Sequence, residues 1–155
     1  MNKDHVVKRR RVVVGGLGVT AIAALGAMIT GPAAATPDSA KQLLQSLAKG
    51  DPKEGKVSIK APEIAENGNA VPVTISVDSP MSVQDHVKAV HVVADGNPNP
   101  GVASFFFAPE SGKCEVQLRV RMAQTQKIVV VAETSDGGLW TAAREVKVTI
   151  GGCGG

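Results

Sequence analysis

The stretch CEVQLRVRM, residues 114–122, alternates apolar and polar side chains along its whole length. Successive side chains of a β-strand point to opposite faces, so a period of two predicts a strand with one face in a core and the other in water. The apolar face carries Cys114, Val116, Leu118, Val120 and Met122. We therefore expect this stretch to belong to a sheet that is buried on one side.

The same alternation recurs on both sides of this stretch. Further strands are expected at residues 57–60, 71–77, 86–94, 102–108, 128–132 and 139–150. The residues between two of them, ENGN at 66–69, are a turn signal, and the prolines at 62 and 72 suggest edge positions. One helix is expected from Pro37 to just before Gly50, with Leu43, Leu44 and Leu47 as its apolar stripe. About seven short strands predict an all-β, immunoglobulin-like antiparallel β-sandwich with a short N-terminal helix.

The amino end has the layout of an export signal. The basic run KRRR at residues 8–11 precedes the uncharged apolar run 12–29, and GPAAA follows at 31–35. Adjacent arginines and a glycine-diluted apolar run favour the twin-arginine pathway, which predicts removal of residues 1–35 and a periplasmic protein. A membrane anchor is not expected, because a spanning helix needs about 20 strongly apolar residues.

The charge of the chain resides in this amino-terminal segment. The whole sequence has a net charge of +3, but residues 36–155 contain 12 basic and 13 acidic side chains. Nucleic-acid binding is therefore not expected. The sequence contains no phosphate-binding glycine loop, Cys-x-x-Cys pair or His-Glu-x-x-His motif, so we expect neither cofactor nor metal. Because twin-arginine export is used by proteins that fold first, a co-exported partner is expected instead.

The carboxyl end, GGCGG at residues 151–155, places four glycines around one thiol. Glycine restricts the backbone least, so Gly151, Gly152, Gly154 and Gly155 are expected to form a flexible arm. Residues 36–150 are expected to form the domain. Five extended residues reach about 16–18 Å. Cys153 is the expected site of covalent attachment. No cation is its neighbour in the sequence, so activation would come from a partner enzyme, and the chain itself is expected to be a non-catalytic carrier.

Other interpretations of the same residues remain open. The tail can be an ordinary disordered terminus, or Cys153 can form a disulfide with Cys114. A third interpretation is a metal site made by Cys153 with His86 and His91, although the spacing matches no ligand pattern.

Three segments resemble the SoxY family of sulfur carriers in the Sox thiosulfate-oxidising system: RVRMAQTQ at 119–126, AETSDGGLW at 132–140 and VKVTIGGCGG at 146–155. The resemblance implies a periplasmic heterodimer with a SoxZ-like subunit, in which the thiol of Cys153 holds sulfur intermediates. A SoxXA-like haem protein would join thiosulfate to this thiol oxidatively, and a SoxB-like hydrolase would release the sulfonate as sulfate. The family pattern has one functional thiol, so Cys114 is a departure, which we interpret as a core substitution that also leaves room for an inactivating internal bond.

Two functions are thus compared. The first is a covalent carrier of sulfur intermediates, and the alternative is a periplasmic binding or adaptor module whose terminal thiol is redox-regulatory or incidental. Arg119, Arg121 and Lys147 lie on polar strand faces, where they would steer an anionic intermediate, dock a partner or simply form a solvated face.

Overall fold

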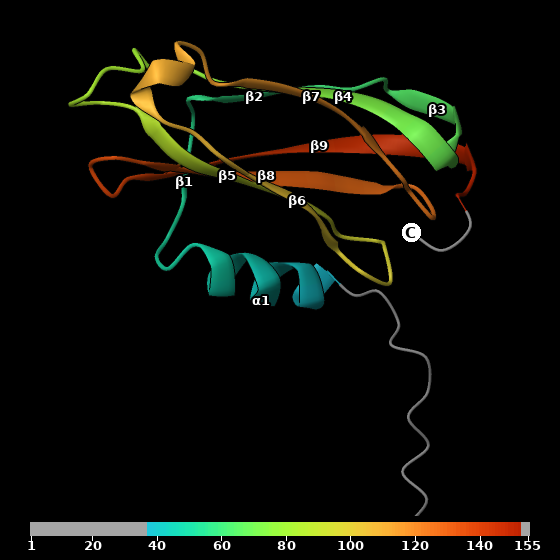
Figure 1. Cartoon of the computed structure of the whole chain (residues 1–155). Coiled ribbons are helices and arrows are strands. Elements are labelled where there is room, and N and C mark those ends of the chain that lie inside the picture. The colour runs from blue at the N-terminus through green and yellow to red at the C-terminus, as the bar shows by residue number, and fades with distance from the viewer. Residues whose placement is uncertain (1–36, 153–155) are drawn as a thin grey trace, which may run out of the picture. The chain divides into compact units, whose positions relative to one another are not determined.

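Two β-sheets pack face to face, and one helix lies against the outer face of the larger sheet (Figure 1). This computed structural model describes residues 37–152. The larger sheet has the strand order β1-β9-β8-β5-β6, with β3 also paired to β9, and the smaller has the order β2-β4-β7. The elements are α1 (Pro37–Leu47), β1 (Lys53–Glu54), β2 (Val57–Lys60), β3 (Ile64–Asn67), β4 (Val71–Val77), β5 (Val87–Ala94), β6 (Gly101–Phe106), β7 (Glu115–Val120), β8 (Gln126–Thr134) and β9 (Leu139–Ile150), with short 3-10 turns at Gly68–Ala70 and Pro109–Ser111.

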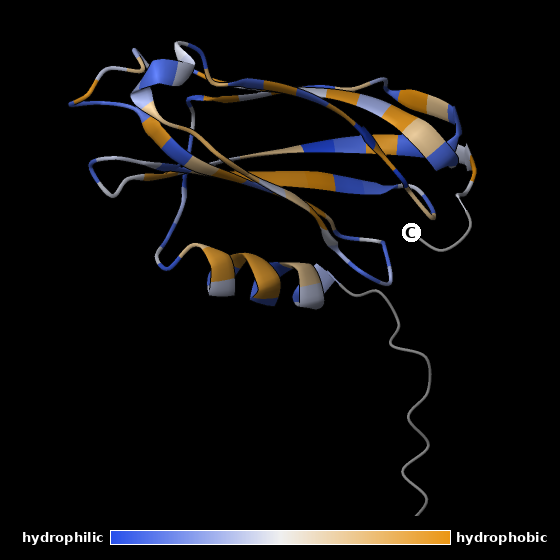
Figure 2. Ribbon diagram, in the orientation of Figure 1, coloured by the Kyte–Doolittle hydropathy of each residue, from blue (hydrophilic) through white to orange (hydrophobic). Residues whose placement is uncertain are grey.

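The core lies between the sheets and consists of alternate residues of their strands. Ile75 of β4 and Ile128 of β8 are almost completely buried, as are Val90 and Val92 of β5. Figure 2 shows the alternation of hydrophobic and hydrophilic residues along the strands. The prediction of an immunoglobulin-like β-sandwich is therefore confirmed.

The strands β1 and β3 are additions that the sequence pattern did not predict. β1 has only two residues, and β3 has the sequence IAEN with Ala65 as its one buried residue, so neither strand shows an alternation. Both run parallel to β9, with Lys53 opposite Trp140 and Ile64 opposite Lys147. Between them, β2 pairs with β4 in the other sheet. The chain therefore alternates between the sheets here and closes one side of an otherwise antiparallel sandwich.

Pro72 lies inside β4, which is the middle strand of the smaller sheet. The sequence predicted an edge position for Pro72. The strand as a whole is not at an edge, but Pro72 itself lies where one neighbouring strand is missing. The neighbour β2 ends at Lys60, opposite Thr74, whereas β7 continues to Arg119, opposite Pro72. At Pro72 the strand therefore has a neighbour on one side only, which suits a residue that lacks an amide hydrogen.

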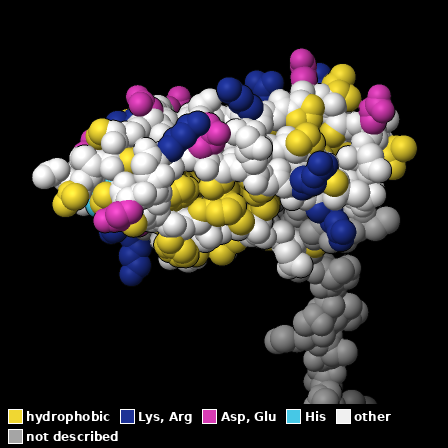
Figure 3. Space-filling view, turned by 45° about the horizontal axis from the view of Figure 1, so that its top comes forward, with side chains coloured by type: hydrophobic (Ala, Val, Ile, Leu, Met, Phe, Trp, Pro, Cys, Tyr) yellow, Lys and Arg dark blue, Asp and Glu magenta, His cyan; other side chains and the backbone are white. Residues whose placement is uncertain are grey.

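The other side of the sandwich lies between the edge strands β6 and β7. Apolar side chains along it pack on the core but remain partly exposed: Val102, Phe105, Phe107, Val116 and Leu118. Phe106, on the opposite face of β6, is 78% exposed. Figure 3 shows a cluster of hydrophobic side chains near the middle of one face of the molecule, with charged side chains around it.

The helix α1 packs on β5 through a narrower stripe than the sequence predicted. Ala40 and Ala48 are buried and Leu44 is half-buried, a spacing of four residues that follows one side of a helix. Leu43 is half-buried as well, whereas Leu47, in the last turn, is 41% exposed. No helix within residues 37–152 is long and apolar enough to cross a membrane.

Candidate functional site

The last strand leads directly into the glycine segment, and the structure describes the first two of its residues. Ile150 still pairs with Asn67 of β3 at the end of β9. Gly151 and Gly152 then lie against the loop that follows β7, where the amide of Gly152 donates a hydrogen bond of 2.8 Å to the carbonyl of Met122. Cys153, Gly154 and Gly155 lie outside the described residues, as does the proposed export signal at 1–35. Attachment at Cys153 therefore stays a prediction.

The loop at residues 121–125, which receives the glycines, is held by a buried asparagine. Asn97 is 3% exposed and donates from Nδ2 to the carbonyl of Arg121 at 2.7 Å. Its Oδ1 accepts from the amide of Ala123 at 3.0 Å and from Nε2 of Gln126 at 2.7 Å. A second tie comes from β9, where the amide of Val148 donates to Oγ1 of Thr125 at 2.9 Å. The backbone that receives Gly152 is thus fixed from two directions.

Of the three cations considered from the sequence, only Arg121 lies beside the segment that precedes Cys153. A Cβ atom added to Gly152 would be 3.0 Å from Cγ of Arg121. Arg119 is opposite Pro72 in the smaller sheet, and Lys147 is opposite Ile64 in the larger one. The sequence included Arg121 among three candidate cations but did not place it beside the tail, because Arg121 approaches the tail only through the packing of the β7–β8 loop.

Cys114 is a core residue. Its side chain is 3% exposed, lies among the buried apolar residues and forms no disulfide. Burial raises the pKa of the Cys114 thiol to about 11, because the thiolate loses its solvation, although a backbone hydrogen bond from Val77 acts in the opposite direction. This confirms the inert core residue that the alternating pattern predicted.

The positions of Cys114 and Gly152 argue against a disulfide between Cys114 and Cys153. Cys114 precedes β7, whereas Gly152 is hydrogen-bonded to Met122 just beyond the other end of that strand. Eight residues of extended chain span about 25 Å, and disulfide-bonded cysteines have Cα atoms within about 7 Å. Because Gly152 is held beyond the far end of β7, a cysteine one residue later is too far from Cys114 for a disulfide.

Cys114 should therefore react slowly with thiol reagents in the folded chain. The rise in pKa from 9.0 to about 11 makes the thiolate fraction at pH 8 about 100-fold smaller, and burial adds to this. Iodoacetamide labelling followed by peptide mass spectrometry should show Cys114 modified at least about 100-fold more slowly than in the urea-unfolded chain. Labelling of Cys114 at nearly equal rates in the two states would contradict its assignment to the core.

The two candidate ligands His86 and His91 have hydrogen-bond partners other than the tail. His91 Nδ1 is 2.8 Å from Oγ of Ser104, and burial lowers the pKa of His91 despite the opposite effect of Glu133. His86 Nδ1 is 3.1 Å from the carbonyl of Ser82. His86 lies just before β5, and Asn97 follows the opposite end of that strand. Within residues 37–152 no group of three or more His, Cys, Asp or Glu side chains is placed to hold a metal ion.

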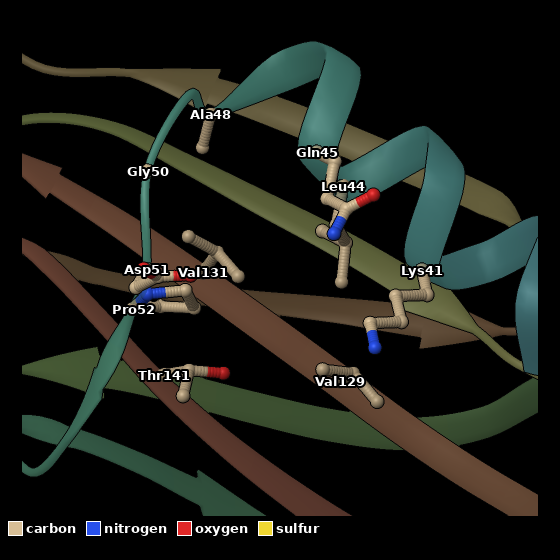
Figure 4. Close-up of a pocket in the computed structure, with 10 residues that line it drawn as sticks. All are labelled: Lys41, Leu44, Gln45, Ala48, Gly50, Asp51, Pro52, Val129, Val131 and Thr141. Carbon is tan, nitrogen blue, oxygen red and sulfur yellow. The ribbon is translucent and has the colours of Figure 1, made fainter.

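A cavity of about 180 Å³ lies between α1 and the strands β8 and β9 (Figure 4). Its lining consists of Lys41, Leu44, Gln45, Ala48, Gly50, Asp51, Pro52, Val129, Val131 and Thr141. Thr141 and Ile150 are at opposite ends of β9, about 30 Å apart along the strand. The cavity is therefore remote from Gly151 and Gly152, which precede Cys153.

Comparison with known proteins gives a family match that reaches the thiol. The model of the family described as sulfur oxidation protein SoxY matches residues 41–153. The solved structure of the sulfur carrier protein SoxY from Chlorobium limicola f thiosulfatophilum is 39% identical, with a TM-score of 0.62 over 74% of this chain and 100% of that chain. No curated protein sequence matches the chain.

Other solved structures share the fold alone. A variant of the superoxide reductase (neelaredoxin) from Ignicoccus hospitalis is 22% identical with a TM-score of 0.54, over 73% of this chain and 92% of that one. A putative superoxide reductase from Thermotoga maritima is 20% identical with a TM-score of 0.54, over 63% and 93%. At these identities the similarity concerns the β-sandwich and not the chemistry.

Proposed function

Because the chain belongs to the SoxY family of sulfur oxidation proteins, we propose that it is a covalent carrier that holds sulfur intermediates on Cys153 and presents them to successive enzymes. The observation that carries the proposal is the match to the Chlorobium sulfur carrier, 39% identical over the whole length of that chain. The family match extends to residue 153, so it includes the cysteine.

The proposed chemistry requires no catalytic group from the carrier itself. The thiolate and thiosulfate lose two electrons to a haem protein of the SoxXA kind, which forms a sulfur–sulfur bond and leaves a thiosulfonate on the cysteine. Water then attacks the sulfonate sulfur in a SoxB-like hydrolase, which releases sulfate and two protons and leaves a persulfide. Both bond changes occur at a partner's active site. The carrier supplies a thiol and access to it, so we assign it no catalytic residue.

The partner and the compartment are part of the same proposal. We expect the leader at residues 1–35 to direct twin-arginine export to the periplasm, together with a SoxZ-like subunit. A partner is supported by the partly exposed apolar side chains along β6 and β7 (Figure 3). Phe106, which is 78% exposed on the other face of β6, adds to this apolar surface area. Large exposed apolar groups of this kind are typical of protein interfaces.

The intact mass of the protein, isolated without reductant from cells that oxidise thiosulfate, tests the carrier function. We expect reducible species heavier than the free thiol by a thiosulfonate group or by additional sulfur atoms. These species should be absent from Cys153→Ser and present in Cys114→Ser, which is the matched control. Adducts that persist in Cys153→Ser would refute attachment there. A single species lighter by two hydrogen atoms and restored by reductant would mean an internal disulfide.

A further inference from the structure

The backbone at Gly152 belongs to a set of hydrogen bonds that joins three separate segments. The amide of Met122 donates to the carbonyl of Gly68 at 2.7 Å, and the amide of Gly152 donates to the carbonyl of Met122 at 2.8 Å. Gly152 is buried, although it lies two residues beyond the end of β9. The chain therefore stays attached to the domain up to the residue before Cys153.

Close approach explains why glycine occupies these positions. A Cβ atom on Gly151 would lie 2.0 Å from the carbonyl oxygen of Ala123, and one on Gly68 would lie 2.2 Å from that of Met122. A Cβ atom on Gly152 would lie 2.9 Å from the carbonyl oxygen of Gly68. Contacts below 3.0 Å to backbone atoms require the backbone to move. None of the three glycines has a positive φ, so space and not backbone conformation selects them.

We propose that Gly68 and the loop 121–123 form a seat for Gly151 and Gly152, which holds the backbone next to Cys153 and confines the swing of the carrier to the residues after Gly152. This inference rests on the carrier function proposed above. Gly68, Gly151 and Gly152 are positioning residues here, and Asn97 supports the seat through its bonds to Arg121 and Ala123.

The seat changes the reach of the carrier. A backbone free from Ile150 onward would carry the Cα atom of Cys153 about 10–11 Å away, whereas a backbone fixed at Gly152 leaves it one Cα–Cα step, about 3.8 Å, from Gly152. An enzyme that processes the bound sulfur must therefore bring its active site to the edge of the sandwich formed by Gly68 and the loop 121–123. The same geometry keeps the stem of Arg121 beside Gly152, the residue that precedes the cysteine.

Amide hydrogen exchange, measured by NMR on the reduced full chain, tests the seat directly. The amide of Gly152 should exchange at least about 100-fold more slowly than in a GGCGG peptide. Gly151→Ala should remove most of this protection while the amides of β8 remain protected. Gly154→Ala is the matched control and should leave the protection of Gly152 unchanged. Peptide-like exchange at Gly152 in the native chain, or protection that survives Gly151→Ala, would overturn the seat.

The outcome is separate from that of the carrier proposal. Sulfur adducts on Cys153 together with an unprotected Gly152 amide would leave the carrier function standing and refute the seat. A protected Gly152 amide without sulfur adducts on Cys153 would leave the seat standing and refute the carrier function. The measurement on the native chain needs no variant, so it decides the question even if Gly151→Ala destabilises the domain.

Discussion

Replacing Cys153 by serine should abolish sulfur turnover in a reconstituted Sox pathway. The hydroxyl cannot form the sulfur–sulfur bond on which the carrier depends, so we expect a loss on the order of 1,000-fold or more, down to the background without carrier. The midpoint of thermal unfolding should stay the same, since the described core is complete without this residue. Turnover should be measured as sulfate release, and unfolding by circular dichroism.

Cys114→Ser is the matched control for this experiment. It places a hydroxyl in the core and should cost about 1–2 kcal/mol of stability, yet it should retain turnover. An adaptor module, by contrast, would keep its activity after Cys153→Ser. Full turnover in Cys153→Ser would therefore replace the carrier with that alternative.

Replacing Asn97 by alanine should lower the free energy of unfolding by about 3 kcal/mol. The change removes the side chain that bonds the carbonyl of Arg121, the amide of Ala123 and Nε2 of Gln126, in surroundings that range from part-buried to buried. Each unsatisfied buried group costs about 1–3 kcal/mol, and partial entry of water reduces the sum. Urea denaturation of the full chain measures the change.

The exposed Asn99, two residues further along the same loop, is the matched control. Asn99→Ala should change the stability by less than about 0.5 kcal/mol. If Asn97→Ala cost no more than Asn99→Ala, the loop 121–125 would not depend on the buried amide. The exchange of the Gly152 amide should accelerate in Asn97→Ala only, because the loop that accepts its hydrogen bond would loosen.

The longer strands were predictable because a half-buried strand shows its two faces in every second residue. This holds for β4, whose alternation places Ile75 in the core, and for β7, whose alternation places Val120 there. It fails for β1, which has two residues, and for β3, in which only Ala65 is buried. Their pairing with β9 is a consequence of the tertiary fold and leaves no periodic signal.

The site was predictable in composition but not in its surroundings. The GGCGG segment directs attention to Cys153, and glycine there suggests conformational freedom. At Gly151 and Gly152 the structure gives the residue another role, the accommodation of Ala123 and Gly68 at close range. Ala123 and Gly68 are distant from the tail in sequence, as are Arg121 and Asn97. Only the fold brings these residues close to it.

The strand that leads into the tail pairs with parts of the chain that are far from it in sequence. β9 pairs with β8 on one side and with β1 and β3 on the other, and the last two precede it by more than 80 residues, as in the pairs Lys53 with Trp140 and Ile64 with Lys147. The larger sheet cannot close until residues up to 150 have been synthesised, so its folding depends on long-range contacts. A nonsense mutation or a protease cut anywhere in β9 would accordingly remove the fold along with the thiol.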